Sequence, residues 1–203
     1  MDSPEGEARS TLELDDDGEA VGMRVVDARH PGADFARARL VDVELVRCDL
    51  SGCDFSESVW QRVRLVDCRA SALEIPQANL RDVSFRDCKL DNANFRLAPL
   101  LRVRFHDSVL SGVEFTGGKL DDVGFRGSDL TGADFSNARC KTVDLRGARL
   151  DGLRGIGALA GATIGFEQLP GLAPALAQAL GLQIRADDEE PTPRKAARRP
   201  ETR

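Results

Sequence analysis

The sequence is short of the residues on which most enzymes and metal sites depend. Only two of its 203 residues are histidines, His30 and His106, and no Ser-His-Asp or Cys-His arrangement is visible around them. The five cysteines contain no CxxC pair, the usual pattern of zinc and redox sites. We therefore predict no catalytic, cofactor-binding or metal-binding residues, and expect a protein that is not an enzyme.

Three further features are missing. The opening stretch MDSPEGEARS is polar and acidic, without the apolar region of a secretory signal. No run of about 18 apolar residues could span a bilayer. Residues 33–152 hold 18 basic and 19 acidic residues, so they lack the concentrated basic surface that nucleic-acid binding needs. We expect a cytoplasmic protein that binds neither membranes nor nucleic acid directly.

What the sequence does have is a period of five. Every fifth residue from Phe35 to Leu150 is large and apolar, with Ala70 and Cys140 as the exceptions, which makes 24 units in phase. A smaller residue, mostly Ala, Val or Cys, stands two positions before most of them. This period matches neither an α-helix nor a β-strand, so it indicates a structural repeat.

A second period, four units long, runs through the first. The small positions 43, 63, 83, 103, 123 and 143 are all valine, and the large positions 50, 90, 110, 130 and 150 are all leucine. Residues 20 apart therefore share an environment. Four units per turn of a repeating structure would explain this, and the 24 units would then make six turns.

The units ADFAR, ARLVD, VELVR and CDLSG resemble the pentapeptide-repeat family, whose consensus is roughly A(D/N)LXX. The resemblance implies an all-β fold, a right-handed quadrilateral parallel β-helix in which four units form one square coil. About six stacked coils, at the spacing of paired strands, would rise about 29 Å.

The composition divides the chain into four parts. Residues 1–20 are acidic and are predicted to be a disordered tail, and residues 21–154 form the β-helix, with regular units over 33–152. Residues 155–184 are predicted to be a C-terminal cap with a short helix. Residues 185–203 are charged and contain prolines, which predicts a second disordered tail.

The cap helix is predicted between Pro174 and Gly181, because proline favours a helix start and glycine its end. Leu172, Leu176 and Leu180 form one apolar stripe along it. So short a helix must pack against something. It either covers the last coil or meets a second copy, and in similar proteins a C-terminal helix forms a homodimer.

Two stacked columns are candidates for chemistry. Cys48, Cys68 and Cys88 stand 20 apart in an inward column, and together with Cys53 and Cys140 they are predicted to be inert packing. An outward column comprises Asp67, Asp87 and Asp107. A salt-bridge lattice is favoured over a cation site there, with these partners on the same face: Arg64, Arg86 and Arg104.

One face of the predicted rod is acidic. Its outward residues include only two basic ones, Arg37 and Arg96, and the candidate binding face is Asp34, Asp54, Glu57, Glu74, Glu114 and Asp134. We predict a non-enzymatic scaffold whose flat walls bind a protein partner. The resemblance also implies an alternative, because one branch of the family binds DNA gyrase as a DNA mimic and is linked to fluoroquinolone resistance. On that alternative, the protein binds the topoisomerase and modulates or protects it.

Overall fold

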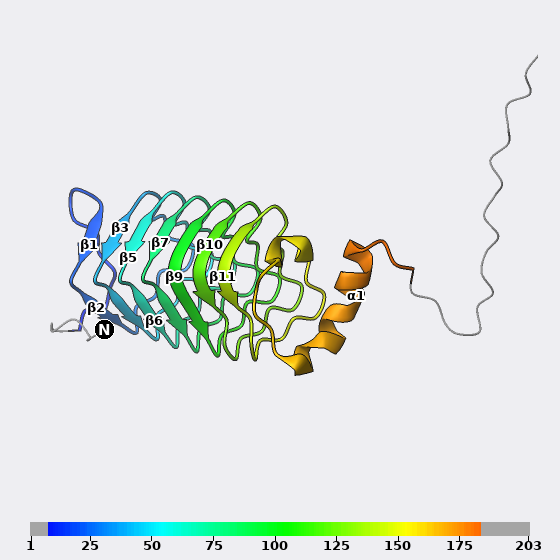
Figure 1. Ribbon diagram of the computed structural model, residues 1–203. Coiled ribbons are helices and arrows are strands. Elements are labelled where there is room, and N and C mark those ends of the chain that lie inside the picture. The colour runs from blue at the N-terminus through cyan, green and yellow to red at the C-terminus, as the bar shows by residue number, and fades with distance from the viewer. Residues whose placement is uncertain (1–7, 184–203) are drawn as a thin grey trace, which may run out of the picture.

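In the computed structural model, which describes residues 8–183, the chain forms a parallel β-solenoid with a short α-helix at its C-terminal end (Figure 1). The strands are β1 (Glu19–Val21), β2 (Arg24–Val26), β3 (Arg39–Val41), β4 (Glu44–Val46), β5 (Val59–Gln61), β6 (Arg64–Val66), β7 (Asn79–Arg81), β8 (Ser84–Arg86), β9 (Pro99–His106), β10 (Lys119–Gly124) and β11 (Arg139–Asp144). The helical elements are the 3-10 helices η1 (Ile156–Leu159) and η2 (Phe166–Gln168) and the α-helix α1 (Leu169–Ala179).

Successive coils pair in parallel at an offset of four units. Leu40 lies beside Trp60 in the ladder between β3 and β5, and Leu120 lies beside Cys140 in the ladder between β10 and β11. Outside the strands, isolated parallel bridges keep the same offset along most of the solenoid. The predicted all-β parallel solenoid of about six coils with a short C-terminal helical cap is confirmed.

The coils turn at corners where the backbone is left-handed. The corner residue follows the central apolar residue by two positions, and every such residue from Gly22 to Gly152 has a positive φ. Glycine, aspartate and asparagine occupy most corners, because glycine has no Cβ and the two short polar residues tolerate this conformation. These residues recur at numbers ending in 2 and 7, so the corners were readable in the sequence, although we did not predict them.

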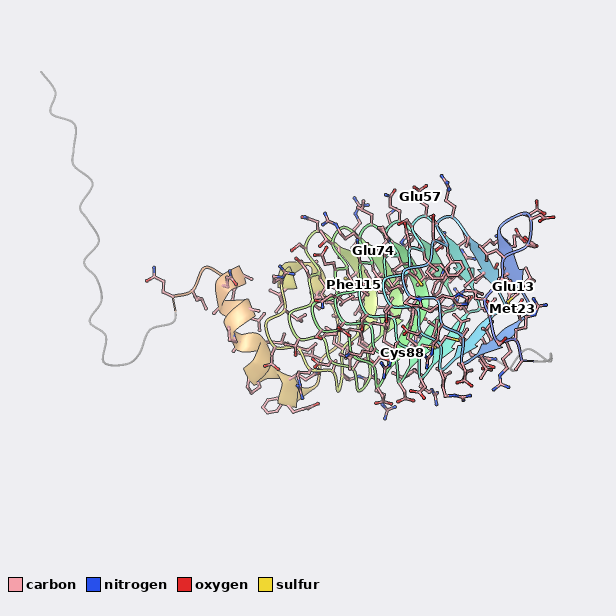
Figure 2. All side chains as sticks on the ribbon, turned by 180° about the vertical axis from the view of Figure 1, so that it is seen from behind. Glu13, Met23, Glu57, Glu74, Cys88 and Phe115 are labelled. Atoms are coloured by element: carbon pink, nitrogen blue, oxygen red, sulfur yellow. The ribbon has the colours of Figure 1, made fainter. Side chains whose placement is uncertain are left out.

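The core is a continuous column of side chains inside the coils. Phe115 and Cys88 lie within the stack (Figure 2). Phe105 stacks between Phe85 and Phe125, at ring centroid distances of 4.8 and 5.1 Å. Because every coil supplies the same inward positions, equivalent apolar side chains pack on one another along the axis, and the phenylalanines stack ring on ring. Their burial is the main favourable term of the fold.

The N-terminal end differs from its prediction. The expected tail of residues 1–20 is wrong for residues 8–20, which extend the solenoid by part of a coil. Leu12 is buried, and its backbone N–H donates to Nε2 of His30 at 2.9 Å. Arg9 forms a parallel bridge with Val25, and β1 pairs with β3. The reason is physical: Leu12 and Ala20 cover apolar residues of the first coil that a disordered tail would leave open.

The C-terminal helix begins earlier than its prediction. α1 starts at Leu169, so Pro174, the predicted start, lies inside the helix, and Pro170 occupies its first turn. A proline there costs little, because the first N–H groups of a helix have no partner within it. Gly181 follows the helix with a φ of 68°, as the predicted end requires. The tails predicted for residues 1–7 and 185–203 lie outside the described residues.

Candidate binding walls of the solenoid

Four flat walls surround the core, and each is named here by its first central residue in the regular repeat. The Phe35 wall and the Leu50 wall are joined from coil to coil by isolated bridges. The Leu40 wall contains β1, β3, β5, β7 and the starts of β9, β10 and β11, and the Leu45 wall contains β2, β4, β6, β8 and the ends of β9, β10 and β11. A side chain on any wall therefore stands in a column with its equivalents in the preceding and following coils.

The predicted acidic face forms a real column on the Phe35 wall. Asp34, Asp54, Glu74, Asn94, Glu114 and Asp134 follow one another through parallel bridges. Asn94 interrupts the run of carboxylates at its middle. Glu57 stands apart from this column, at a left-handed corner of the same wall, where its side chain projects outward (Figure 2).

The aspartates of this column are engaged in local turns. Asp54 Oδ1 accepts hydrogen bonds from the backbone N–H of Ser56 at 2.8 Å and from its hydroxyl at 2.5 Å. Asp134 Oδ1 accepts the backbone N–H of Ser136, also at 2.8 Å. A short acidic side chain before the central residue thus fixes the chain that leads to the corner. These carboxylates have a structural role, whatever else they bind.

The glutamates have neighbours on the wall as well. Glu74 Oε2 accepts a hydrogen bond from Asn94 Nδ2 at 2.6 Å, and Glu114 lies 3.4 Å from Nη1 of Arg96. Burial raises the pKa of Asp134, but the Ser136 hydrogen bonds and the Arg154 guanidinium outweigh it and hold that pKa below its ordinary value. The carboxylates of the acidic column are therefore partly compensated by their surroundings.

Ion pairs across successive coils hold the corners next to the Leu40 wall. Asp42 accepts two hydrogen bonds from Arg62, at 2.5 and 2.6 Å, and Asp82 accepts two from Arg102, at 2.5 and 2.8 Å. These hydrogen bonds from arginine are the main cause that lowers the pKa of both carboxyl groups. Bidentate pairing of this kind fixes geometry as well as charge.

The lattice predicted for the outward column of Asp67, Asp87 and Asp107 is wrong. Within residues 8–183 these aspartates form no ion pair, and Arg64 contacts Glu44 instead. Arg104 reaches Asp122, at 2.6 Å. The column positions are left-handed corners, which aspartate occupies for its backbone preference.

All five cysteines are free thiols, as their predicted packing role requires. Cys48, Cys53, Cys68 and Cys88 are buried, and Cys140 is half-buried near the end of the stack. Burial raises the pKa of Cys140 to about 11 and raises that of Cys53 as well. A raised pKa makes the thiols of Cys53 and Cys140 poor nucleophiles.

The structure assembles no site for a metal ion. Over residues 8–183, no three side chains of His, Cys, Asp or Glu come together in a way that could hold one. His30 accepts the Leu12 N–H and packs edge-on against Phe35, with ring centroids 5.6 Å apart. It serves the N-terminal end of the core. In the same range, no helix is long and apolar enough to cross a membrane.

Comparison with known proteins identifies the family of the chain. The family model of the pentapeptide repeat region matches residues 38–100 and 78–154, which together span more than half of the chain. The chain belongs to the pentapeptide-repeat family. No curated protein sequence matches it.

Two solved structures of pentapeptide-repeat proteins are among those similar to this chain. A trypsin-treated variant of QnrB1, a plasmid-mediated fluoroquinolone resistance protein, is 20% identical and covers 88% of this chain and 97% of its own, with a TM-score of 0.53. A protein of the Arabidopsis thaliana thylakoid lumen is 23% identical and covers 62% of this chain and 74% of its own, with a TM-score of 0.39. The likeness to QnrB1 shows a shared fold.

The pentapeptide-repeat body ends in an apolar cap. Leu172 is buried against the last coil, but Leu176 and Leu180 of the predicted stripe are 38% and 73% exposed. Phe166, in η2 before the helix, is 86% exposed. The helix therefore covers the last coil with Leu172 and part of Leu176, and it leaves Leu180 mostly exposed to solvent. Figure 1 shows α1 at the extreme end of the stack.

Sequence reasoning missed the residue that fastens this cap. Gln168 is buried, and its Nε2 donates to the carbonyl oxygens of Leu145 and Ala148 at 2.7 and 2.6 Å. Its Oε1 accepts the N–H of Gly165 at 2.6 Å. A glutamine before two proline-containing helical turns gives no pattern of its own, so no signal in the sequence pointed to it.

Proposed function

We propose that this protein is a non-enzymatic scaffold that binds a macromolecular partner, most simply a protein, on the walls of its β-solenoid. The observation that carries the proposal is the fixed register of the walls, in which outward side chains recur once per coil on a fully packed core. Such a surface loses little conformational freedom on binding. Membership of the pentapeptide-repeat family supports the same function.

The acidic column of the Phe35 wall is the candidate binding face. Asp34, Glu74 and the corner residue Glu57 are exposed, so their carboxylates can reach a partner. Asp54, Glu114 and Asp134 are half-buried and contribute mainly to the field of the wall. A partner for this wall would be basic where it meets the column.

The alternative is a DNA mimic that binds DNA gyrase or another topoisomerase. The acidic column and the fold shared with QnrB1, a fluoroquinolone resistance protein, favour it. Charge density argues against it. The outward residues of the Phe35 wall sum to a net −4 over five coil steps, six acidic against two basic, or about one charge per 6 Å. Duplex DNA carries one per roughly 1.7 Å of axis.

A supercoiling assay with purified gyrase distinguishes the two functions. On the scaffold proposal, a large molar excess of the protein leaves supercoiling unchanged. On the mimic alternative, supercoiling falls, and reversing the charges of Asp34, Asp54, Glu74 and Glu114 to lysine abolishes the effect. A matched control reverses four aspartates on other faces: Asp67, Asp87, Asp107 and Asp121.

The scaffold proposal itself is tested by affinity capture with the full chain from lysate of its host. The expected result is a protein recovered in near-stoichiometric amounts. Addition of the free, untagged chain should compete with the immobilised chain and reduce its capture. Capture of no protein at near-stoichiometric level, over several growth conditions, would contradict the proposal.

We further propose that the C-terminal cap joins two copies of the chain into a homodimer. Its support is the exposed apolar surface of Phe166, Leu176 and Leu180 at the end of the rod. Large apolar side chains exposed within one short segment often mark a protein–protein contact. Light scattering should report a dimer for the wild type and a monomer for Leu176→Glu/Leu180→Glu. A monomeric wild type at micromolar concentration would contradict this proposal.

A further inference from the structure

The stretch that runs from a corner of the Phe35 wall into the Leu40 wall departs from the repeat in three ways at once. In the stretch RLAPLL, Leu97 occupies a left-handed corner with φ 59°, and its side chain is 59% exposed. Pro99 stands in the parallel ladder at the start of β9, where a proline has no N–H to donate. Leu101 faces outward on the same strand and is half-buried. Each choice is unfavourable or neutral for the fold.

The core does not require these residues. The inward positions of the same stretch, Ala98 and Leu100, pack as their equivalents do in other coils. Polar residues occupy the same three columns elsewhere, so the fold accepts them there: Asn137 and Gln77 for Leu97, Asn79 for Pro99, and Gln61 for Leu101. Residues that depart from the repeat without stabilising the fold are expected at sites where a protein binds a partner.

Two cations without ion pairs flank these apolar residues. Arg81 is the ladder neighbour of Leu101 in the preceding coil, and Lys119 is the neighbour of Pro99 in the following one. Neither forms an ion pair with any residue between 8 and 183, although both side chains are exposed. Lys119 donates its backbone N–H to Ala98, at 3.1 Å, so the ladder resumes directly after Pro99.

The aspartates of this wall already have ion-pair partners. Each of its four aspartates forms an ion pair with an arginine or lysine: Asp42 with Arg62, Asp82 with Arg102, Asp121 with Lys141, and Asp122 with Arg104. The charge that remains on the wall is therefore positive. Among the described coils, it surrounds the only stretch of the Leu40 wall and its preceding corner that has three outward apolar residues.

We propose that Leu97, Pro99 and Leu101, with Arg81 and Lys119 beside them, form a docking surface for an acidic protein segment that carries an apolar anchor. The anchor covers the leucines, and its neighbouring carboxylates pair with the two cations, which sets orientation and rate of association. This inference rests on the proposed scaffold function and specifies one wall and one partner chemistry. It differs from the proposal for the acidic column, which would attract a basic partner to the Phe35 wall, although Leu97 stands at the corner between the two walls.

The test uses the full chain and a fluorescein-labelled peptide of aspartates and glutamates with two leucines at its centre. Fluorescence anisotropy should show binding that weakens about tenfold or more in Leu97→Asn/Leu101→Gln, whose new residues already occur in these columns. Arg81→Gln/Lys119→Gln should weaken it several-fold and flatten its dependence on salt. The matched controls on other walls, Val109→Ser and Arg126→Gln, should leave it unchanged.

Three results would overturn the inference: no binding of the peptide to wild type at low salt, equal binding by the leucine double variant, or equal binding of a peptide whose leucines are replaced by serine. The scaffold proposal would survive each of them, because capture of a partner by the full chain tests it without reference to this wall. Failure of capture together with specific peptide binding would instead remove the scaffold proposal and leave a peptide-binding surface.

Discussion

Removal of the Phe105 ring tests how much the interior stack holds the walls in register. Phe105 has no exposed surface and stacks face to face with Phe85 and Phe125. It also meets Phe95 and Phe115 edge-on, at 6.0 and 6.2 Å. Loss of a buried phenylalanine costs about 3–5 kcal/mol, and the coils on both sides limit collapse of the cavity. We expect Phe105→Ala to destabilise by about 5 kcal/mol, the upper end of that range.

The matched control is Phe35→Ala at the N-terminal end. Phe35 retains 8% exposure, stacks on Phe55 at 4.9 Å and meets His30 edge-on. Its end of the rod can relax, so we expect a loss of about 2–3 kcal/mol. Equilibrium urea unfolding, followed by Trp60 fluorescence and by far-ultraviolet circular dichroism, measures both. Equal losses in the two variants would refute the reasoning that stacking on both sides makes the interior tighter.

Three further predictions concern the cap, a corner and the pH dependence. Gln168→Leu should cost about 2–4 kcal/mol in the same unfolding experiment, because the carbonyls of Leu145 and Ala148 lose their donor; an unchanged midpoint would contradict this. Thr142→Gly should raise stability by about 1 kcal/mol, since a β-branched residue holds φ 53° there, and a loss would count against corner strain. Arginine holds the pKa of Asp42 below its ordinary 3.8, so its contribution is complete above that value and is lost as pH falls through the lowered pKa. The urea midpoint should therefore fall as the pH is lowered below about 4, with a smaller fall in Asp42→Asn.

The repeat body was predictable because one physical rule applies in every unit. The inward positions must be apolar in each coil, so Phe35 through Leu150 recorded the period of five, and the recurring valines recorded the length of one coil. The corners are marked in the sequence as well, because most of them are glycine, aspartate or asparagine. The ends were not predictable in the same way. Leu12 and Gln168 each act through contacts that occur once, so no repetition in the sequence marks them.

The candidate sites also divide into features that recur in every coil, which were predictable, and contacts that occur once, which were not. The acidic column at Asp34 and Glu74 was visible as a pattern, because its residues recur at the coil period. The pattern did not predict that the carboxylates of Asp54 and Asp134 accept hydrogen bonds in local turns, because this depends on side-chain geometry. The cations at Arg81 and Lys119 became notable only when the ion pairs of their neighbours were known.

Photo-crosslinking from each wall is the sharpest test of the proposal that partners bind the walls of a rigid rod. A benzoyl-phenylalanine would replace one exposed or half-buried outward residue per wall in the full chain inside host cells: Glu74, Leu101, Val109 or Arg126. We predict discrete protein adducts concentrated on particular walls, with Leu101 among the reactive positions. Absence of protein adducts from all four walls, or equal weak labelling from each, would contradict the proposal.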